Sequence, residues 1–429
     1  MTSQSINGIH IRMMYSACVV IETPDCKILC DPWFTDGIYD GSWYLHPKNE
    51  DPISLIGNCD YVYISHIHPD HYDPKFLHGY FAKYGKKEIL VADFPENYLA
   101  MSIQREGFSV SICKSGTKFK NTEISIHPHI TNSLSDIDSA LLVQYHADNR
   151  THRVLNLNDC VYDPDFLNQF VFEEQIDVML LGYTGAGPYP QTYFDVDDPS
   201  LVHAANKKKS QFFDRYLETV KHVPSKVRVP FAGQYVLGGC LAVLNDVRGV
   251  ADAIEIKEID DRAVVLKEYE GEIDTESLVA VAERIEPISR TSIESRIREI
   301  ESFPMTYDSI NAGLVPVGLV INLLNKALPR ARKKSECVDD YFFAFELSSG
   351  QMAVLNANRD GVSGVQMIDN SEQLPEPRSE ISIDLRYLFG LLTGLFHWNN
   401  AEVGSQFQTR RVPDQFSREA QNFLNFLTV

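Results

Sequence analysis

The loop that follows the apolar run at residues 61–64 constrains this chain more than any other segment. Four potential metal ligands fall within six positions: His66, His68, Asp70 and His71. Neutral imidazoles bind Zn²⁺ or Fe²⁺, and a carboxylate neutralises part of the metal's charge. His66 and His68 are two residues apart, so an extended backbone directs both side chains to one side. Asp70 and His71, beyond a turn, can then reach a second metal, which predicts a two-metal hydrolytic site. A surface histidine cluster at a strand end is the alternative interpretation.

Length and composition narrow the class of protein. A chain of 429 residues exceeds the size at which a single core stops growing, so we expect two domains. The formal net charge of −20 argues against a nucleic-acid partner, and we expect a small-molecule substrate. No apolar stretch approaches the ~20 residues that span a bilayer, and the N-terminus lacks a signal-peptide pattern. The eight scattered cysteines suit reduced thiols, so we expect a cytoplasmic protein.

The pattern of the chain changes near residue 270. Residues 1–265 alternate short β-like runs with helical stretches, which predicts a layered α/β metal-binding catalytic domain. Residues 275–429 are expected to form a smaller α+β domain of unknown role, without a recognisable set of metal ligands. Its predicted elements are a helix within Thr275–Ile300, an apolar segment Gly313–Ala327, strands at Tyr341–Leu347 and Met352–Ala357, and a final helix Ser417–Leu427.

Four ligands do not complete two metal sites, so further ligands are expected at strand ends downstream. His127 and His129 flank Pro128 where a β-like run stops, and one of them, most simply His129, would join His66 and His68. Both could instead be ordinary loop histidines. Asp159 follows another β-like run, and a carboxylate in that position can bridge two cations.

Several segments match a known pattern beyond the histidine loop. They are Val19–Glu22, Lys27–Trp33, Trp43–Pro47, Ile64–His71, Asp138–Val143, Leu155–Cys160, Gly185–Thr192 and Pro230–Gly233. In these segments the chain resembles the metallo-β-lactamase superfamily, and within it the metallo-β-lactamase-like part of CMP-N-acetylneuraminate hydroxylase and its bacterial relatives from surface-sugar gene clusters. The stretch His397–Gly404 is similar to a tail found on some of these bacterial proteins.

The resemblance implies an αβ/βα sandwich with metals held at one edge. It assigns His66, His68 and His129 to a first metal, Asp70 and His71 to a second, and Asp159 to a position between them. The chain also departs from the pattern. The hydroxylase carries a Rieske iron–sulfur module with Cys-x-His and Cys-x-x-His pairs, whereas no cysteine here has a histidine at either spacing.

A second departure concerns the last metal ligand. The family's last histidine follows shortly after Pro-Phe-Ala-Gly, and this chain has Leu-Gly-Gly-Cys at residues 237–240, around Gly239. Cys240 and His222 are the candidate substitutes. A single metal, or a weak second site, is therefore an alternative to a full two-metal centre.

These observations lead to three functional hypotheses. The first is a metal-dependent hydrolase that holds one or two Zn²⁺ and uses a metal-bound hydroxide on a sugar, nucleotide-sugar or related small polar substrate. The second is a non-haem iron oxygenase of a sugar-type substrate, which would need a separate reductase. The third is a catalytically impaired scaffold whose second metal site has decayed.

Site roles beyond the metal ligands follow from position and residue type. Asp70 would orient the nucleophile, and His46 would contact substrate or donate a proton. Residues of two loops and the cysteine near the missing ligand are the candidate substrate contacts: Trp33, Tyr39, Trp43, Tyr183, Tyr189 and Cys240.

Overall fold

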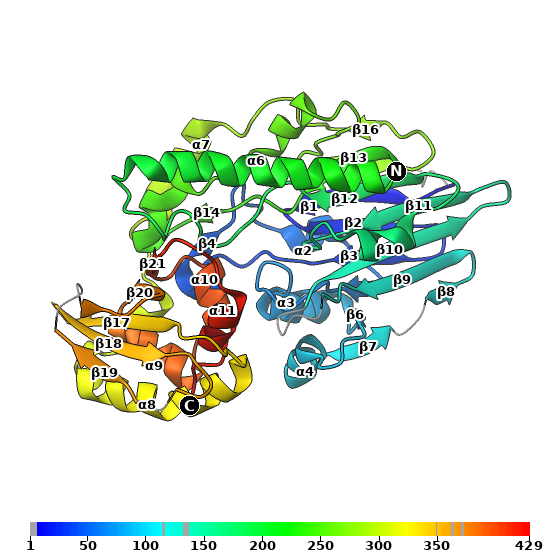
Figure 1. Ribbon diagram of the computed structural model, residues 1–429. Coiled ribbons are helices and arrows are strands. Elements are labelled where there is room, and N and C mark those ends of the chain that lie inside the picture. Colours follow the sequence, from blue (N-terminus) through cyan, green and yellow to red (C-terminus); the bar gives the residue numbers. More distant parts are fainter. Residues whose placement is uncertain (1–6, 114–115, 132–136, 349, 362–363, 370–372) are drawn as a thin grey trace.

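The computed structural model describes residues 7–113, 116–131, 137–348, 350–361, 364–369 and 373–429. The chain forms a large N-terminal body, coloured blue to green, and a smaller C-terminal body, coloured yellow to red (Figure 1). None of the helices in these ranges is long and apolar enough to cross a membrane.

Two sheets form the centre of the N-terminal body. Across the described residues the first sheet runs in the order β16 (Ala280–Val281), β15 (Glu272–Asp274), β1 (His10–Tyr15), β2 (Cys18–Glu22), β3 (Lys27–Cys30), β5 (Tyr61–Tyr63), β6 (Glu88–Ala92) and β7 (Ser109–Cys113). The second runs in the order β13 (Ser225–Phe231), β12 (Ile176–Gly182), β11 (Thr151–Asn156), β10 (Ser139–His146), β9 (Thr122–Pro128) and β8 (Thr117–Phe119).

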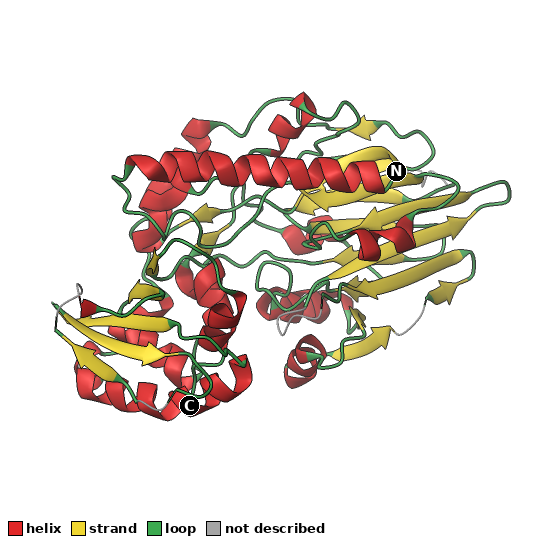
Figure 2. Ribbon diagram, viewed as in Figure 1, coloured by secondary structure: helices red, strands yellow, loops and turns green. Residues whose placement is uncertain are grey.

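The sheets pack face to face and helices cover their outer faces. The inner core joins side chains of both sheets, such as Val19 and Ile21 of β2 with Leu141 and Val143 of β10. Helices α3 (Pro74–Tyr84) and α4 (Tyr98–Arg105) cover the first sheet, and α5 (Pro164–Leu167) and α6 (Pro199–His222) cover the second (Figure 2). This is the αβ/βα sandwich that the resemblance implies, and it confirms the layered α/β architecture expected from the sequence pattern.

Asp-Pro pairs start several of these helices and fix where the following side chains lie. The carboxylate of Asp73 accepts a hydrogen bond from the backbone N–H of Phe76, while Pro74 begins α3. Asp163 caps α5 in the same way. An acidic N-cap followed by proline suits a helix start, because the cap accepts an unpaired N–H and proline needs none.

The first sheet continues past the boundary expected at residue 265. Strand β15 pairs antiparallel with β1, with Ile273 opposite Ile11, and β16 extends this edge. The helix predicted within Thr275–Ile300 is confined to α7 (Arg290–Ile300), because these strands occupy the earlier residues. Arg296 of α7 lies 2.7 Å from the Asp36 carboxylate, which holds the helix against the sandwich.

The C-terminal body is an α+β domain with its own core. Its described sheet runs in the order β19 (Gln366–Ile368), β18 (Gln351–Asn356), β17 (Phe342–Ser348), β20 (Arg378–Ser382) and β21 (Gln408–Val412). Its helices are α8 (Val317–Ser335), α9 (Leu385–Thr393), α10 (Trp398–Val403) and α11 (Arg418–Asn425). Side chains such as Leu324, Phe345 and Trp398 fill the space between sheet and helices. Helices α10 and α11 lie on the side that faces the sandwich (Figure 1).

Candidate metal centre

Three of the predicted ligands meet at one edge of the sandwich. His66 and His71 lie in the loop after β5, and Asp159 follows β11 of the other sheet. One potential ligand atom from each of these residues lies within 4.8 Å of the others. The loop and the end of β11 therefore bring together side chains that are far apart in the sequence.

His66 presents one ring nitrogen to this space. Its Nε2 lies 2.9 Å from Nδ1 of His68 and 4.0 Å from Oδ2 of Asp159. Its Nδ1 lies 2.9 Å from Oγ of Ser65 and 3.7 Å from the carboxylate of Asp138. Burial and the neighbouring histidines lower the pKa of His66 well below its ordinary value, so the ring is neutral and retains a lone pair for a cation.

His71 is oriented from behind by a buried carboxylate. Its Nδ1 lies 3.0 Å from Oδ2 of Asp31. Asp31 also accepts hydrogen bonds of 2.7 Å from the backbone N–H and the hydroxyl of Ser65. The opposite nitrogen, Nε2, lies 3.6 Å from Oδ2 of Asp70 and 3.6 Å from Oδ1 of Asp159. Metal-binding histidines usually have this arrangement: an acidic partner holds one ring nitrogen, and the other ring nitrogen faces the metal site.

The electrostatics of the site suit a bound cation. Loss of hydration and the charge of Asp159 raise the pKa of Asp138 to about 6. Loss of hydration also raises the pKa of Asp159 to about 6, although the charge of His71 opposes the change. The two carboxylates resist being ionised at the same time, and a divalent cation between them would favour the ionised form of both. The donor set of imidazole and carboxylate therefore fits Zn²⁺ or Fe²⁺.

The two downstream histidines lie on the second sheet, at the end of β9. The ring of His129 is buried, with Nε2 3.2 Å from the Asp163 carboxylate, and its backbone N–H donates to the carbonyl of Asp138. Nδ1 of His127 lies 2.7 Å from the side-chain oxygen of Gln169. Of the two, His129 is the one bonded to Asp138, and its ring faces Asp163.

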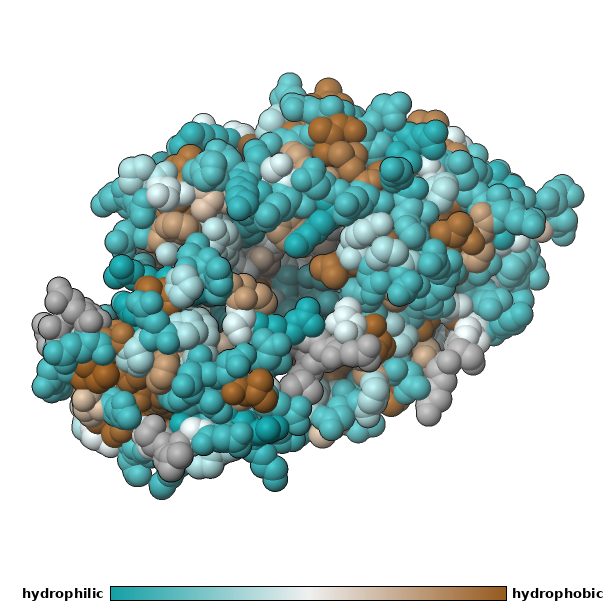
Figure 3. All heavy atoms as spheres, viewed as in Figure 1, coloured by the Kyte–Doolittle hydropathy of each residue, from teal (hydrophilic) through white to brown (hydrophobic). Residues whose placement is uncertain are grey.

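A cleft of about 250 Å³ opens beside the ligands. The hydroxyl of Tyr39 donates a hydrogen bond to Asp70 at its rim. Trp43 also lines the cleft, stacked on Tyr235 with ring centroids 3.4 Å apart. On the opposite side Gly185 lets α6 approach, because a Cβ at this position would lie 1.9 Å from the ring of Phe212. The visible face of the molecule is hollowed between its two bodies (Figure 3).

The other predicted aromatic contacts are not among the described residues that line this cleft. Trp33 is fully buried, and its indole N–H donates to the carbonyl of Thr35. Tyr183 is buried in the core beneath α6. Tyr189 packs against Tyr193, towards the C-terminal body. Of these rings, Trp33 supports the wall of the cleft by packing against Trp43, with ring centroids 6.2 Å apart.

His46 and the residues at the missing-ligand position are also placed elsewhere. Nε2 of His46 lies 3.2 Å from the hydroxyl of Ser292 on α7, and burial lowers the pKa of this imidazole. Cys240 is exposed, with Sγ 3.9 Å from the hydroxyl of Tyr307, and Gly239 packs beside Met305. His222 is at the far end of α6, bonded to the side chain of Asn168.

Three side chains at the site were not assigned a role from the sequence: Asp31, Asp138 and Asn399. Asp31 and Asp138 each border a strand, and an acidic residue at that position was the available signal. Asn399 comes from α10 of the C-terminal body, and its side-chain oxygen lies 2.6 Å from Nε2 of His68. Nothing in the local sequence around residue 399 indicates this contact.

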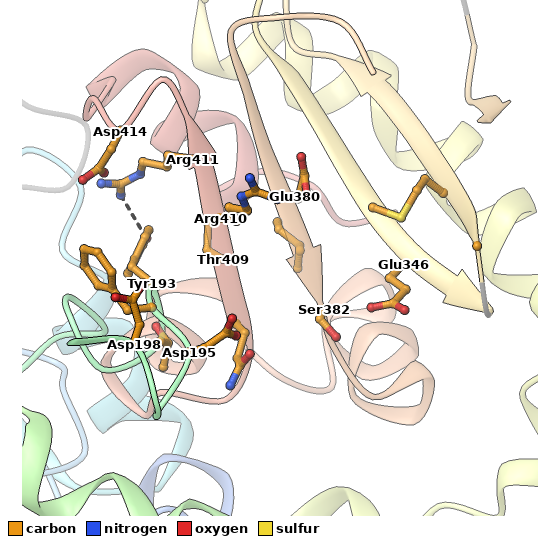
Figure 4. Close-up of a pocket in the computed structure, with 16 residues that line it drawn as sticks. Tyr193, Asp195, Asp198, Glu346, Glu380, Ser382, Thr409, Arg410, Arg411 and Asp414 are labelled. Atoms are coloured by element: carbon orange, nitrogen blue, oxygen red, sulfur yellow. Dashed lines mark hydrogen bonds and ion pairs between the residues drawn. The ribbon is translucent and has the colours of Figure 1, made fainter. Parts of the chain in front are cut away.

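A larger cavity, about 540 Å³, lies between the two bodies, outside the metal centre. Figure 4 shows it between the loop that carries Tyr193 and strands β20 and β21, with Arg411 directed at Tyr193. The Arg411 guanidinium donates a hydrogen bond of 2.9 Å to the Tyr193 hydroxyl. None of the predicted ligands lines this cavity, and its described contacts join the two bodies.

Comparison with known proteins finds a family match for part of the N-terminal body. Residues 10–207 match the sequence family described as the Beta-lactamase superfamily domain. A Mycobacterium tuberculosis protein named as a Rieske 2Fe-2S iron–sulfur protein is 32% identical over 227 residues, which are 50% of this chain and 42% of that protein. Cytidine monophosphate-N-acetylneuraminic acid hydroxylase of Danio rerio is 22% identical over 250 residues, 54% of this chain and 40% of the hydroxylase.

One solved structure aligns with part of the chain. The metallo hydrolase Igni18 of Ignicoccus hospitalis aligns with a TM-score of 0.43 at 15% identity, covering 62% of this chain and 97% of that protein. The chain spans about two fifths of the length of the curated relatives named above. The family match to residues 10–207 and the two-sheet topology lead to one conclusion: the N-terminal body of this chain has the metallo-β-lactamase fold.

Proposed function

We propose that this protein is a metal-dependent hydrolase of a small polar substrate. The observation that carries the proposal is the meeting of His66, His71 and Asp159, with ligand atoms within 4.8 Å, at the side of a cleft of about 250 Å³. A bound divalent cation would supply two things there: it would make a water molecule acidic enough to ionise near neutral pH, and it would polarise the substrate.

Each ligand has a defined donor atom in this proposal. His66 would use Nε2 and His71 would use Nε2, because the other nitrogen of each ring already faces Ser65 or Asp31. Asp159 would use the carboxylate that faces both rings. His129, whose ring nitrogen faces Asp163, remains a proposed ligand that would require the ring or the carboxylate to turn.

Asp70 is the proposed proton acceptor. The hydroxyl of Tyr39 holds one carboxylate oxygen, and the other faces Nε2 of His71 at 3.6 Å. A carboxylate fixed in this way at the cleft can orient an attacking water and accept its proton. His46, bonded to Ser292 beneath α7, is not part of this proposal.

The dimensions of the cleft limit the substrate. Its volume of about 250 Å³ lies below the ~300–1,000 Å³ of pockets that hold drug-sized ligands, so a group of monosaccharide size fits within it. Tyr39, Trp43 and Tyr235 provide an aromatic wall, and Arg215 is the cationic side chain among the described lining residues. We infer a sugar or a similar polar ring as the reacting group, with any nucleotide portion lying outside.

An oxygenase with a non-haem iron is the second candidate. It is supported by the sequence similarity to curated hydroxylases and by the carboxylate-rich donor set, with Asp70, Asp138 and Asp159 around His66 and His71. The sequence lacks the Cys-x-His and Cys-x-x-His pairs of a Rieske centre, so electrons would come from a separate reductase.

Metal analysis of the purified chain tests these proposals. Zinc at one or two equivalents per chain, with no visible absorption band, supports the hydrolase. Iron with a visible charge-transfer band supports the oxygenase. Metal below one equivalent that reconstitution does not raise contradicts both enzymes and leaves the scaffold hypothesis.

A further inference from the structure

The C-terminal domain contacts the metal centre directly through α10. The side-chain oxygen of Asn399 lies 2.6 Å from Nε2 of His68, although the two residues are 331 positions apart. The other nitrogen of His68, Nδ1, lies 2.9 Å from Nε2 of His66. The imidazole of His68 is therefore held between the histidine loop and a residue of the second domain.

The contact with Asn399 favours one tautomer of the His68 ring. An amide oxygen only accepts hydrogen bonds, so the nitrogen that faces it must carry the proton. Nε2 of His68 is then the donor to Asn399, and Nδ1 keeps its lone pair. That lone pair points to the same space as Nε2 of His66, the space that Asp159 also faces at 4.0 Å. A neutral ring with this tautomer is the form that binds a cation through Nδ1.

The same part of the C-terminal domain supports the opposite side of the site. Tyr39, whose hydroxyl holds Asp70, has a left-handed backbone with φ of 51°, which is unfavourable for a residue with a side chain. The side-chain amide of Gln406 donates a hydrogen bond of 2.6 Å to the carbonyl of Tyr39. Ser42 donates one of 2.6 Å to the carbonyl of Gly404. These contacts with residues 404–406 hold the loop in the conformation that directs Tyr39 at Asp70.

We propose that Asn399 is a positioning residue of the metal centre, which fixes the tautomer and orientation of His68 as a ligand. The inference rests on the proposed function, because it requires a metal at this site. It assigns a role to the C-terminal domain: α10 and the segment that follows it form one wall of the centre. Orienting partners of this kind typically contribute roughly 10–100-fold to metal affinity.

The test compares three full-length variants with the wild-type chain. Asn399→Leu removes the acceptor at similar size, Asn399→Asp keeps an acceptor oxygen, and Asn400→Ala changes the next residue of the same helix as a control. Affinity for Zn²⁺ and Co²⁺ is measured by competition with a chromogenic chelator, and the visible spectrum of the Co²⁺-loaded protein reports the geometry of the ligands. Circular dichroism verifies folding, and Asn399→Ala replaces the leucine variant if that variant does not fold.

The expected result is a roughly 10–100-fold lower affinity and an altered Co²⁺ spectrum for Asn399→Leu. Asn399→Asp should retain both within a few-fold, because its carboxylate accepts the same proton, and Asn400→Ala should match wild type. A folded Asn399→Leu or Asn399→Ala variant with wild-type affinity and spectrum overturns this inference alone. A wild-type chain that binds neither ion overturns the proposed function as well.

Discussion

The Asp31 carboxylate lies 3.0 Å from Nδ1 of His71, and both side chains are almost completely buried. Burial opposes a charge on the ring, but Asp159, Asp70 and Asp31 outweigh it and raise the pKa of His71 to about 10. His71 of the metal-free protein is therefore protonated at neutral pH. Its contribution to folding stability is complete below the unfolded pKa near 6.5 and is lost as the pH rises through about 10.

The first prediction is a pH dependence of metal binding. A cation at Nε2 of His71 must displace a proton, so affinity should rise about tenfold per pH unit between pH 7 and 9 and level off near pH 10. Calorimetry in buffers of different ionisation enthalpy measures the protons released. The Asp31→Asn variant lacks one of the three carboxylates that raise the pKa of His71. In this variant the pH range over which affinity rises should lie lower. Equal proton release at pH 7 and pH 11 would contradict the assignment of His71.

The second prediction distinguishes ligands from other histidines. His66→Ala and Asp159→Ala should each lose most of the bound metal, because both provide atoms to the shared space. His127→Ala is the matched control, since Nδ1 of His127 bonds Gln169, and it should retain wild-type metal content. His129→Ala should lower metal content if this residue joins His66. Metal content is measured by mass spectrometry after dialysis, and an unchanged His66→Ala would refute the site.

The third prediction concerns the core of the C-terminal domain. Trp398 is 1% exposed, and its indole N–H donates to the carbonyl of Leu427 at 2.8 Å. Trp398→Ala should lower the free energy of unfolding by about 3–5 kcal/mol, because it leaves a large cavity and an unpaired carbonyl. Leu395→Ala, at a side chain 63% exposed, should change it by less than about 0.5 kcal/mol. Chemical denaturation measures both, and similar values for the two variants would contradict the packing described.

The fourth prediction uses a buried lysine of α6. Burial, and to a lesser extent the charge of Arg248, lowers the pKa of Lys208 to about 7. Between pH 7 and about 10.5 the unfolded chain therefore binds more protons than the folded chain, and stability should rise with pH in this window. Lys208→Met should weaken the rise, whereas exposed Lys207→Met should leave it unchanged. Denaturation midpoints measured across the pH range test this, and a slope that Lys208→Met does not alter would refute it.

The sequence predicts the fold and the centre of the site where the determinants are local. His66, His68, Asp70 and His71 are within one loop, so residue type and spacing are enough to indicate a metal site. The αβ/βα sandwich is likewise predicted by the alternation of strands and helices, together with the resemblance. The family match to residues 10–207 supports this part of the prediction.

The remaining features depend on contacts between distant segments. The position of His46 depends on α7, which begins at Arg290 and covers the imidazole with Ser292. The C-terminal boundary of the sandwich in the sequence depends on the pairing of β15 with β1. This boundary is hard to predict because a three-residue strand gives little periodic signal. The role of Asn399 depends on docking of the whole C-terminal domain. No local pattern encodes such contacts, because they arise from tertiary packing.

The hydrogen bond from Ser42 to the carbonyl of Gly404 joins residues 362 positions apart. Two bodies with separate cores would ordinarily melt in two transitions. Here the metal centre lies at their junction, and an ion that binds only the native arrangement stabilises everything required to form it. Loading the protein with metal should therefore merge the two calorimetric transitions into one, and chelation should separate them again.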